Sequence, residues 1–285
     1  MTFLHRNRWL TPYLLLAPGL AFLAFFFLVP LYYLLHTSLQ EGTAITGFTF
    51  TWAWNNYSDA ISQYHEQLFR SLEYGAIATA LALAISYPLC YWIAFRGGRW
   101  KNVLLLCIVA PFFVTYLIRT LAWGTILADE GSVVDALQAI GVLGEDGRLL
   151  ATSVAVVAGI TYNFLPFMAL PLYVSLEQID ARLIEAAKDL YASRAKAFLR
   201  VTLPLSLPGV VAGTLLTFIP AVGDFINAEL LGTPKQVMIG NVIQSEFLVR
   251  TDYGEAAALS VVVMAAVLLL IVVYTRSVGT ERLTG

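Results

Sequence analysis

Long apolar stretches recur along almost the whole chain, and they limit its possible folds more than any other feature. A helix needs about 20 consecutive apolar residues to cross the hydrocarbon core of a bilayer. Of the 285 residues, 59% are hydrophobic and 13% are charged, a balance that is foreign to water-soluble domains. We therefore predict an all-α polytopic membrane protein, a single domain over residues 1–285 with six transmembrane helices. The predicted spans are about 11–39, 71–95, 102–127, 149–174, 208–231 and 254–275.

The basic residues indicate how these helices are oriented. Cytoplasmic segments of membrane proteins are enriched in Lys and Arg. If both termini are cytoplasmic, 12 of the 17 basic residues fall on that side. They are Arg6, Arg8, Arg96, Arg99, Lys101, Arg182, Lys188, Arg194, Lys196, Arg200, Arg276 and Arg282. The first apolar stretch is too long for the core of a signal peptide, and no small-residue cleavage site follows it, so we predict an uncleaved helix that enters from the cytoplasm.

The carboxylates show the opposite distribution. This orientation leaves five basic and 14 acidic residues outside or in the spans, a net charge of −9. A negative outer half would concentrate a cationic solute at the entrance. The alternative is that the acidic residues simply follow the topology.

One charged, helix-forming segment, 176–207, separates the fourth and fifth spans. Its apolar residues repeat with helical spacing, and charged residues occupy the other side of the helix. This apolar face comprises Leu183, Ile184, Ala187, Leu190 and Tyr191. The Asp180 carboxylate can accept the free N–H groups of the first turn. A second, basic helical piece follows, and we expect Pro204 and Pro208 to end it because proline lacks an N–H donor.

Within this segment, Glu185-Ala186-Ala187 is followed by Leu203-Pro204 after fifteen intervening residues. The pattern resembles the EAA loop of bacterial ABC-importer permeases, and the run from Glu185 to Gly240 is similar to spermidine/putrescine permeases of the PotB type. The resemblance implies the type I ABC-importer permease fold in a bacterial inner (plasma) membrane. The partners that it implies are an ATPase subunit dimer that binds ATP and Mg, a second homologous permease, an extracytoplasmic substrate-binding protein and membrane lipid, without nucleic acid.

The same resemblance makes segment 176–207 a coupling loop that docks onto the ATPase. The residues that it assigns to coupling are Glu185, Ala186, Ala187, Leu190 and Tyr191. Tyr191 stands where the family usually has glycine. If that glycine has a positive φ, a tyrosine costs about 1–2 kcal/mol, so either the loop stays more helical there or Tyr191 packs into the partner. Without a partner, such an amphipathic helix would rest on lipid head groups.

Polar residues inside the spans are the candidates for substrate contact, because a charged side chain at the bilayer centre costs about 2.5–3.5 kcal/mol. Asp224, late in the fifth span, is the main candidate, and Glu229 follows it near the outer surface. A polyamine needs carboxylates for its ammonium groups and aromatic faces for its methylenes. Further pathway candidates are Tyr116, Trp123, Asn163 and Phe164, with Tyr162 beside them. Packing or lipid-facing roles stay open for each of the aromatic residues.

Arg119 in the third span argues against a cation pathway unless its charge is paired. We predict a structural ion pair with Asp224 or with Glu73. If Asp224 makes this pair, its role in substrate binding weakens.

No motif in the sequence indicates catalysis. GxxxxGK[ST], HExxH and GxSxG are all absent, and the histidines and cysteines are scattered, so we predict no metal site and no cofactor bound by the chain. We expect a transporter subunit rather than an enzyme, with ATP hydrolysed by the partner. The alternatives are the same permease role for an opine, an aminophosphonate or a ferric ion, or an ion-coupled secondary transporter. The last would show paired broken helices in an inverted repeat, and we find none in the sequence.

Overall fold

The computed structural model describes residues 10–43, 46–144 and 147–278. Some charged residues that were counted for the orientation lie outside this part of the chain: Arg6, Arg8, Glu145, Asp146, Glu281 and Arg282. The chain forms two compact units. The first comprises Met1–Gln63 and Ile243–Ala265, and the second comprises Tyr64–Val242 and Ala266–Gly285.

The first unit begins with a nearly continuous apolar helix. It consists of α2 (Leu10–Leu23), the π-helical turn η1 (Ala24–Leu28) and α3 (Val29–Ser38). A small antiparallel hairpin follows, β1 (Gln40–Thr43) with β2 (Gly47–Phe50), in which Gln40 pairs with Phe50. The Asn56 amide donates to the carbonyls of Ser38 at 3.0 Å and Gln40 at 2.9 Å, which holds the hairpin against the start of α4. This hairpin is the exception to the predicted all-α fold.

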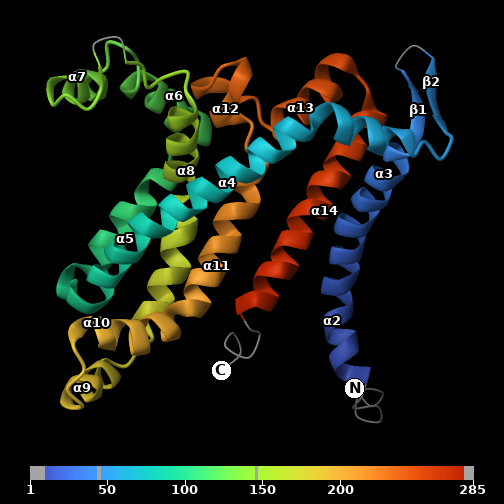
Figure 1. The fold of residues 1–285 in the computed structure, drawn as a ribbon. Coiled ribbons are helices and arrows are strands. Elements are labelled where there is room, and N and C mark those ends of the chain that lie inside the picture. Colours follow the sequence, from blue (N-terminus) through green and yellow to red (C-terminus); the bar gives the residue numbers. More distant parts are fainter. Residues whose placement is uncertain (1–9, 44–45, 145–146, 279–285) are drawn as a thin grey trace. The chain divides into compact units, whose positions relative to one another are not determined.

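The remaining elements are helical, and Figure 1 shows their order. They are α4 (Asn55–Arg96), η2 (Gly98–Trp100), α5 (Lys101–Val109), η3 (Ala110–Phe113), α6 (Tyr116–Ile126), α7 (Ser132–Ala139), α8 (Ser153–Glu177), α9 (Ala181–Asp189), α10 (Arg194–Ala197), η4 (Phe198–Thr202), α11 (Leu203–Val222), α12 (Ile226–Leu231), η5 (Pro234–Gln236), α13 (Ile239–Ser245), η6 (Glu246–Arg250) and α14 (Tyr253–Val278). Helix α4 deviates from helical geometry at Tyr64, where φ is −117° and ψ is 16°.

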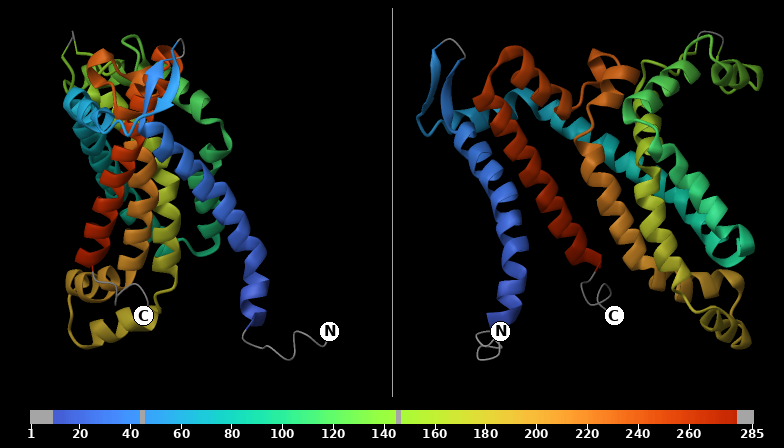
Figure 2. Two further views of the ribbon diagram at one scale, coloured as in Figure 1. Left: turned by 90° about the vertical axis from the view of Figure 1, so that its right-hand side faces the viewer. Right: turned by 180° about the vertical axis from the view of Figure 1, so that it is seen from behind.

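Helices α8 and α11 pack closely and form the centre of the second unit (Figure 2). Two glycines of α11 permit the close approach. A Cβ atom at Gly209 would lie 2.4 Å from Cβ of Ser175, and one at Gly213 would lie 2.8 Å from Sδ of Met168. Helices α9 and α10 lie at one end of this pair, and α6 and α12 lie at the other (Figure 1).

The third predicted span is broken. The helical stretches Gly98–Phe113 and Tyr116–Ile126 meet at an angle of 96°. The residues between them, Val114 and Thr115, have extended backbones with ψ near 138° and 139°. Pro111, just before the break, has no N–H to donate, which weakens the helix there.

The fifth predicted span differs at both ends. Pro204 and Pro208 do not end the helix of the loop, because η4 and α11 continue it without interruption from Arg194 to Val222. The π-helical turn η4 precedes Pro204, and such local adjustments allow membrane helices to accommodate proline. At the other end α11 stops at Val222, and a break at Gly223–Phe225 separates it from α12.

Five helices of the described chain are long and apolar enough to cross a membrane, and the bent pair around Val114 makes up to six. They comprise Leu15–Ser38, Asn55–Arg96, Ser153–Glu177, Arg194–Val222 and Tyr253–Arg276. The predicted helical membrane fold is therefore confirmed.

Candidate functional site

A cluster of polar side chains is buried in the second unit, at the end of α8 and α11 that lies away from α9. Helix α6 contributes Tyr116 and Thr120, α8 contributes Asn163, and the break after α11 contributes Asp224, with Asn227 following on α12. Exposure is 6% for Asp224 and at most 1% for Thr120, Asn163 and Asn227. We refer to these five residues as the polar cluster. It connects two breaks in transmembrane helices, one before Tyr116 and one around Asp224.

Asp224 is the acceptor at the centre of this cluster. Its Oδ2 accepts hydrogen bonds from the Tyr116 hydroxyl and, at 2.7 Å, from Nδ2 of Asn227. Its Oδ1 accepts the backbone N–H of Asn227, in the first turn of α12, at 2.9 Å. The Asn227 amide also reaches the Tyr116 oxygen at 2.6 Å. The carboxylate is thus fully engaged within the chain.

Asn163 closes the other side of the cluster. Its Nδ2 lies 3.1 Å from Oγ1 of Thr120 and 3.3 Å from Oδ1 of Asn227. Its Oδ1 is buried without a hydrogen-bond partner among the described residues. Gly159, one turn earlier on α8, has no side chain that would block Asn227, since a Cβ there would lie 2.6 Å from the Asn227 Oδ1. The close contact of α8 with α12 therefore depends on this glycine.

The predicted ion pair of Arg119 is wrong for this structure. Arg119 is only 6% exposed, but neither Asp224 nor Glu73 forms an ion pair with it in the described part of the chain, and Glu73 is exposed on α4. Its guanidinium carbon instead lies 5.5 Å from the centre of the Tyr116 ring and 5.7 Å from that of Phe112. Its Nε and Nη1 have no hydrogen-bond partner within residues 10–43, 46–144 and 147–278. Tyr116 and Asn227 take the place at Asp224 that the prediction gave to Arg119.

The other predicted pathway residues are only partly brought together. Phe164 is buried, with its ring 6.0 Å from that of Tyr116. Trp123 lies two turns further along α6 and stacks edge-on with Tyr162 at 5.3 Å, away from the hydrogen bonds of the cluster. Glu229 is exposed on α12. The site therefore centres on Asp224, Tyr116 and Asn163, with Phe164 beside them.

Sequence reasoning missed the bridging roles of Thr120 and Asn227. The signal was present for both: Thr120 is one helical turn from Tyr116, and Asn227 is one turn from Asp224. Nothing in the sequence, however, shows that α6 and α12 lie side by side.

The coupling loop has a defined local structure in the same unit. Asp180 Oδ1 accepts the N–H of Arg182 at 2.9 Å, which confirms the predicted cap of α9. At the other end, N–H of Tyr191 bonds to the carbonyl of Lys188 at 2.9 Å, and that of Ala192 to Ala187 at 3.0 Å. This pair of bonds is a Schellman motif, and Tyr191 holds its left-handed position with φ of +57°. The prediction offered two alternatives, a loop that stays helical at Tyr191 or a Tyr191 that packs into the partner. The first is wrong, because the backbone of Tyr191 is left-handed.

The predicted apolar face of α9 is divided between two surroundings. Ile184 is half-buried and packs against a core formed by α4 and α8. Leu190 and Tyr191 are 82% and 98% exposed, and Leu183 is 48% exposed. The exposure of these side chains differs because one side of α9 packs against α4 and α8. The exposed part alone is available to another protein.

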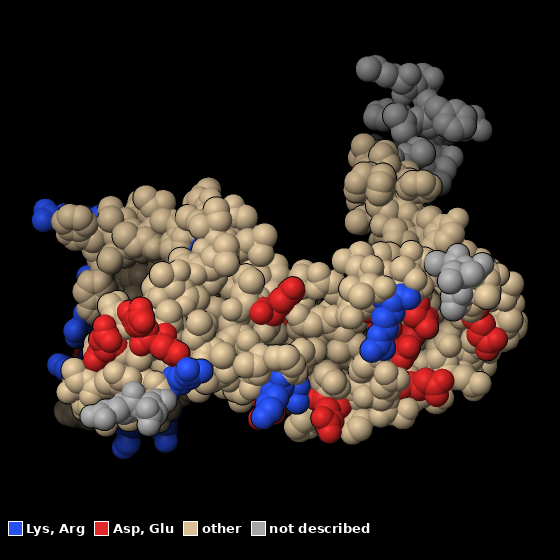
Figure 3. Space-filling model, turned by 90° about the horizontal axis from the view of Figure 1, so that it is seen from above, with Lys and Arg blue, Asp and Glu red and all other residues tan. Residues whose placement is uncertain are grey.

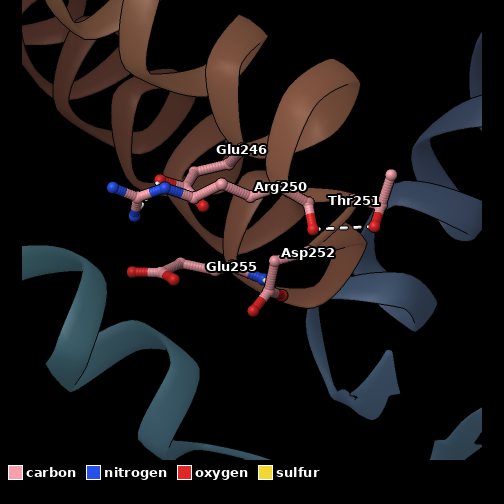
Figure 4. Close-up of polar contacts among 5 residues, drawn as sticks. All are labelled: Glu246, Arg250, Thr251, Asp252 and Glu255. Atoms are coloured by element: carbon pink, nitrogen blue, oxygen red, sulfur yellow. Dashed lines mark hydrogen bonds and ion pairs between the residues drawn. The ribbon is translucent and has the colours of Figure 1, made fainter. Parts of the chain in front are cut away.

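Charged residues also gather in the first unit, between η6 and α14 (Figure 4). Nη1 of Arg250 lies 2.8 Å from Oε1 of Glu246, which is 2% exposed. Asp252 Oδ1 accepts the N–H of Glu255 at 3.0 Å, and Thr251 between the two helices has φ of +56°. These contacts shape the turn into α14. On the face seen from above, the carboxylates form separate groups, and Lys or Arg side chains lie beside several of them (Figure 3).

Broken membrane helices around a buried polar cluster are a feature of membrane transport proteins. Residues 86–279 match the family model described as the binding-protein-dependent transport system inner membrane component. The chain belongs to this family, so it is an inner-membrane transporter component and not an enzyme.

The relatives agree with this assignment. The chain is 37% identical over 258 residues to the spermidine/putrescine transport system permease protein PotB of Haemophilus influenzae, covering 90% of both chains. It is also 37% identical over 224 residues to PotB of Escherichia coli, covering 78% of this chain and 82% of that one. A solved bacterial ABC transporter that imports alginate has a chain with a TM-score of 0.69 at 17% identity, covering 99% of this chain and 98% of that one. This likeness confirms the predicted ABC-importer permease fold.

Proposed function

We propose that this chain conducts a polyamine, spermidine or putrescine, as one permease subunit of an ATP-driven importer. The observation that carries the proposal is the 37% identity over 90% of the chain to a protein that is named for this substrate. The buried carboxylate of Asp224 beside aromatic rings supports it, because a polyamine presents ammonium groups separated by apolar methylenes.

The proposed partners are those of a binding-protein-dependent importer. They are a substrate-binding protein outside, a second homologous permease within the membrane, and two ATPase subunits that hold ATP and Mg in the cytoplasm. The coupling loop would meet the ATPase with Leu190 and Tyr191, whose exposure supports such a contact. Glu185, Ala186 and Ala187 precede them on α9 as further coupling residues. Both termini are then cytoplasmic.

The cation would bind Asp224 by displacing a hydrogen-bond donor from its carboxylate. Its carboxylate is bound by Tyr116 and Asn227 in this structure, so an ammonium group must replace one of these donors. The donors come from α6 and α12, each of which follows a helix break. Movement at these breaks, driven through the coupling loop, would release the carboxylate. Asn163, Phe164, Trp123 and Glu229 would line the remaining route.

The test is ATP-driven uptake of labelled spermidine by the reconstituted complex with Asp224→Asn. The amide keeps the shape of the side chain and removes its charge, so we expect uptake to fall at least tenfold while binding-protein-stimulated ATPase activity persists. Asp135→Asn is the matched control, because Asp135 is an exposed carboxylate on α7. Equal uptake by Asp224→Asn and wild type would remove Asp224 from the cation route. If the wild-type complex hydrolyses ATP in response to its binding protein but moves no polyamine, the substrate assignment is wrong.

One observation favours a second cargo. The buried guanidinium of Arg119 has no anionic partner in the described residues, and it would suit a substrate with an anionic group, such as an opine or an aminophosphonate. Arg119→Met removes the charge at similar volume. If the cargo is a polyamine, this variant should keep or increase spermidine uptake, because a repelling charge is lost. If Arg119 binds an anionic cargo, uptake of that cargo should fall sharply in Arg119→Met and be partly kept in Arg119→Lys.

A further inference from the structure

The coupling loop lines a pocket in which Glu185 is the one residue that the proposed transport role uses. Its volume is about 300 Å³. The walls are the last turns of α4, one face of α9, and the helical piece from α10 into η4. All of these elements belong to the second unit. The pocket therefore lies between the coupling helix and the end of a membrane span.

Three basic side chains line this pocket from three separate elements. They are Arg96 at the end of α4, Lys188 on α9 and Arg194 at the start of α10. None of them forms an ion pair in the part of the chain that the structure describes. Glu185 is the one carboxylate in the lining, so the charge of the pocket is positive. Like charges held together by the fold favour an anionic ligand.

Three aromatic side chains also line the pocket. The rings of Tyr91 and Phe95 are 4.9 Å apart, and that of Phe198 lies 5.9 Å from Tyr91. Tyr91 and Phe95 belong to the candidate span Asn55–Arg96, and Arg96 is its last residue. Basic and aromatic residues at the end of a span lie at the level of the lipid head groups. The occupant should accordingly have an anionic head and an apolar body.

We propose that this pocket binds the phosphodiester head group of an anionic phospholipid. Arg96, Lys188 and Arg194 surround the phosphate, and the aromatic residues contact the glycerol and the first methylenes of the acyl chains. Basic pockets beside membrane helices on the cytoplasmic side bind such head groups. The pocket side of α9 carries Ile184, Glu185 and Lys188, whereas Leu190 and Tyr191 remain exposed. A lipid in the pocket would therefore leave Leu190 and Tyr191 uncovered for the proposed ATPase contact, and Glu185 alone among the coupling residues would lie beside it.

Bound lipid would hold α9 against the end of α4. The lipid would then fix the position from which the coupling loop meets the ATPase. This consequence rests on the proposed function. The binding of the lipid is independent of the cargo, so it can be tested whatever the complex transports.

The test measures phosphatidylglycerol retained by the purified complex in neutral detergent, by native mass spectrometry during a lipid titration. We expect wild type to retain phosphatidylglycerol in preference to phosphatidylcholine. The double substitution Arg96→Gln with Arg194→Gln should weaken this retention roughly 30-fold, because two basic contacts are lost. Arg96→Lys with Arg194→Lys keeps both charges and should keep most of the retention. The elution volume of each complex reports whether it remains assembled.

The matched control is Arg182→Gln with Lys196→Gln, which removes the same amount of charge, from coupling-loop residues outside the pocket. Equal weakening by both glutamine pairs would overturn the proposal, since it would show attraction to the surface as a whole. Equal retention of the two lipids by wild type would also overturn it. A third arm adds glycerol 3-phosphate. If this soluble phosphate displaces the lipid at millimolar concentration, the pocket recognises free phosphate compounds and the lipid assignment is wrong.

Discussion

Tyr191 adopts a left-handed backbone conformation that most residues avoid. It is the left-handed residue of the Schellman motif that ends α9, and glycine is usual at this position. Its ring is 98% exposed, so contacts within the chain do not compensate the strain. A residue that is both strained and exposed is expected to gain its stabilisation from another protein.

Two substitutions separate the backbone of Tyr191 from its ring. Tyr191→Gly should stabilise the isolated chain by about 0.5–1 kcal/mol, since the relief of strain is partly offset by the greater freedom of unfolded glycine. Tyr191→Ala keeps the strain. Because both variants lack the ring, both should weaken ATPase co-purification if Tyr191 contacts that subunit. Unchanged complex yield and unchanged ATPase coupling in both variants would mean that the ring has no partner there.

The amino-acid sequence is sufficient to predict part of the polar cluster. A carboxylate and an amide in apolar spans are costly, and this cost alone singles out Asp224 and Asn163. The same cost singles out Arg119, but it does not predict which residues contact the Arg119 side chain. The cation–π contacts of Arg119 depend on how α6 leaves the break, and that geometry is set by tertiary packing.

At the level of elements, periodicity and proline differ in their predictive value. The amphipathic pattern and Asp180 correctly predicted α9. The prediction that proline ends the helix of the loop was wrong, because Pro204 lies within a continuous helix after a π-helical turn. The breaks before Tyr116 and around Asp224 were not predicted, because apolar residues flank both and hydropathy does not distinguish a bent span from a straight one.

The packing of α8 on α11 provides a prediction for these elements. A Cβ at Gly209 would lie 2.4 Å from Cβ of Ser175 and 2.8 Å from the Pro171 carbonyl, so Gly209→Ala must push the helices apart. We expect a loss of about 1–3 kcal/mol, measured by thermal unfolding in detergent. Gly19→Ala on α2 is the control, because a Cβ there meets nothing within 4 Å. If the two variants unfold at the same temperature, the glycine contact does not limit the packing.

For the whole molecule, charge predicts an orientation that side-specific labelling can test. With Cys107 replaced by serine, Glu41→Cys on the hairpin should react with a membrane-impermeant maleimide in intact spheroplasts. Arg182→Cys on α9 should react only after the membrane is opened, since α9 would be cytoplasmic. Both residues are exposed. Labelling of Arg182→Cys in intact spheroplasts would reverse the predicted topology.

The bend in the third span has a consequence for how the protein is made. The stretch from Gly98 to Phe113 is only about 27 Å long, because α5 rises about 1.5 Å per residue and the flanking 3-10 turns about 2.0 Å, and a hydrocarbon core is about 30 Å thick. The helix that continues from it turns by 96° and carries Arg119. A ribosome-bound chain that ends here would therefore hold this span weakly in the bilayer. The Tyr116 hydroxyl donates to Asp224, in the break before α12, and accepts from Asn227 on α12, while Thr120 contacts Asn163 on α8 and Asn227. These partners follow α6 in the sequence, so this span should become fixed only after synthesis has passed α12.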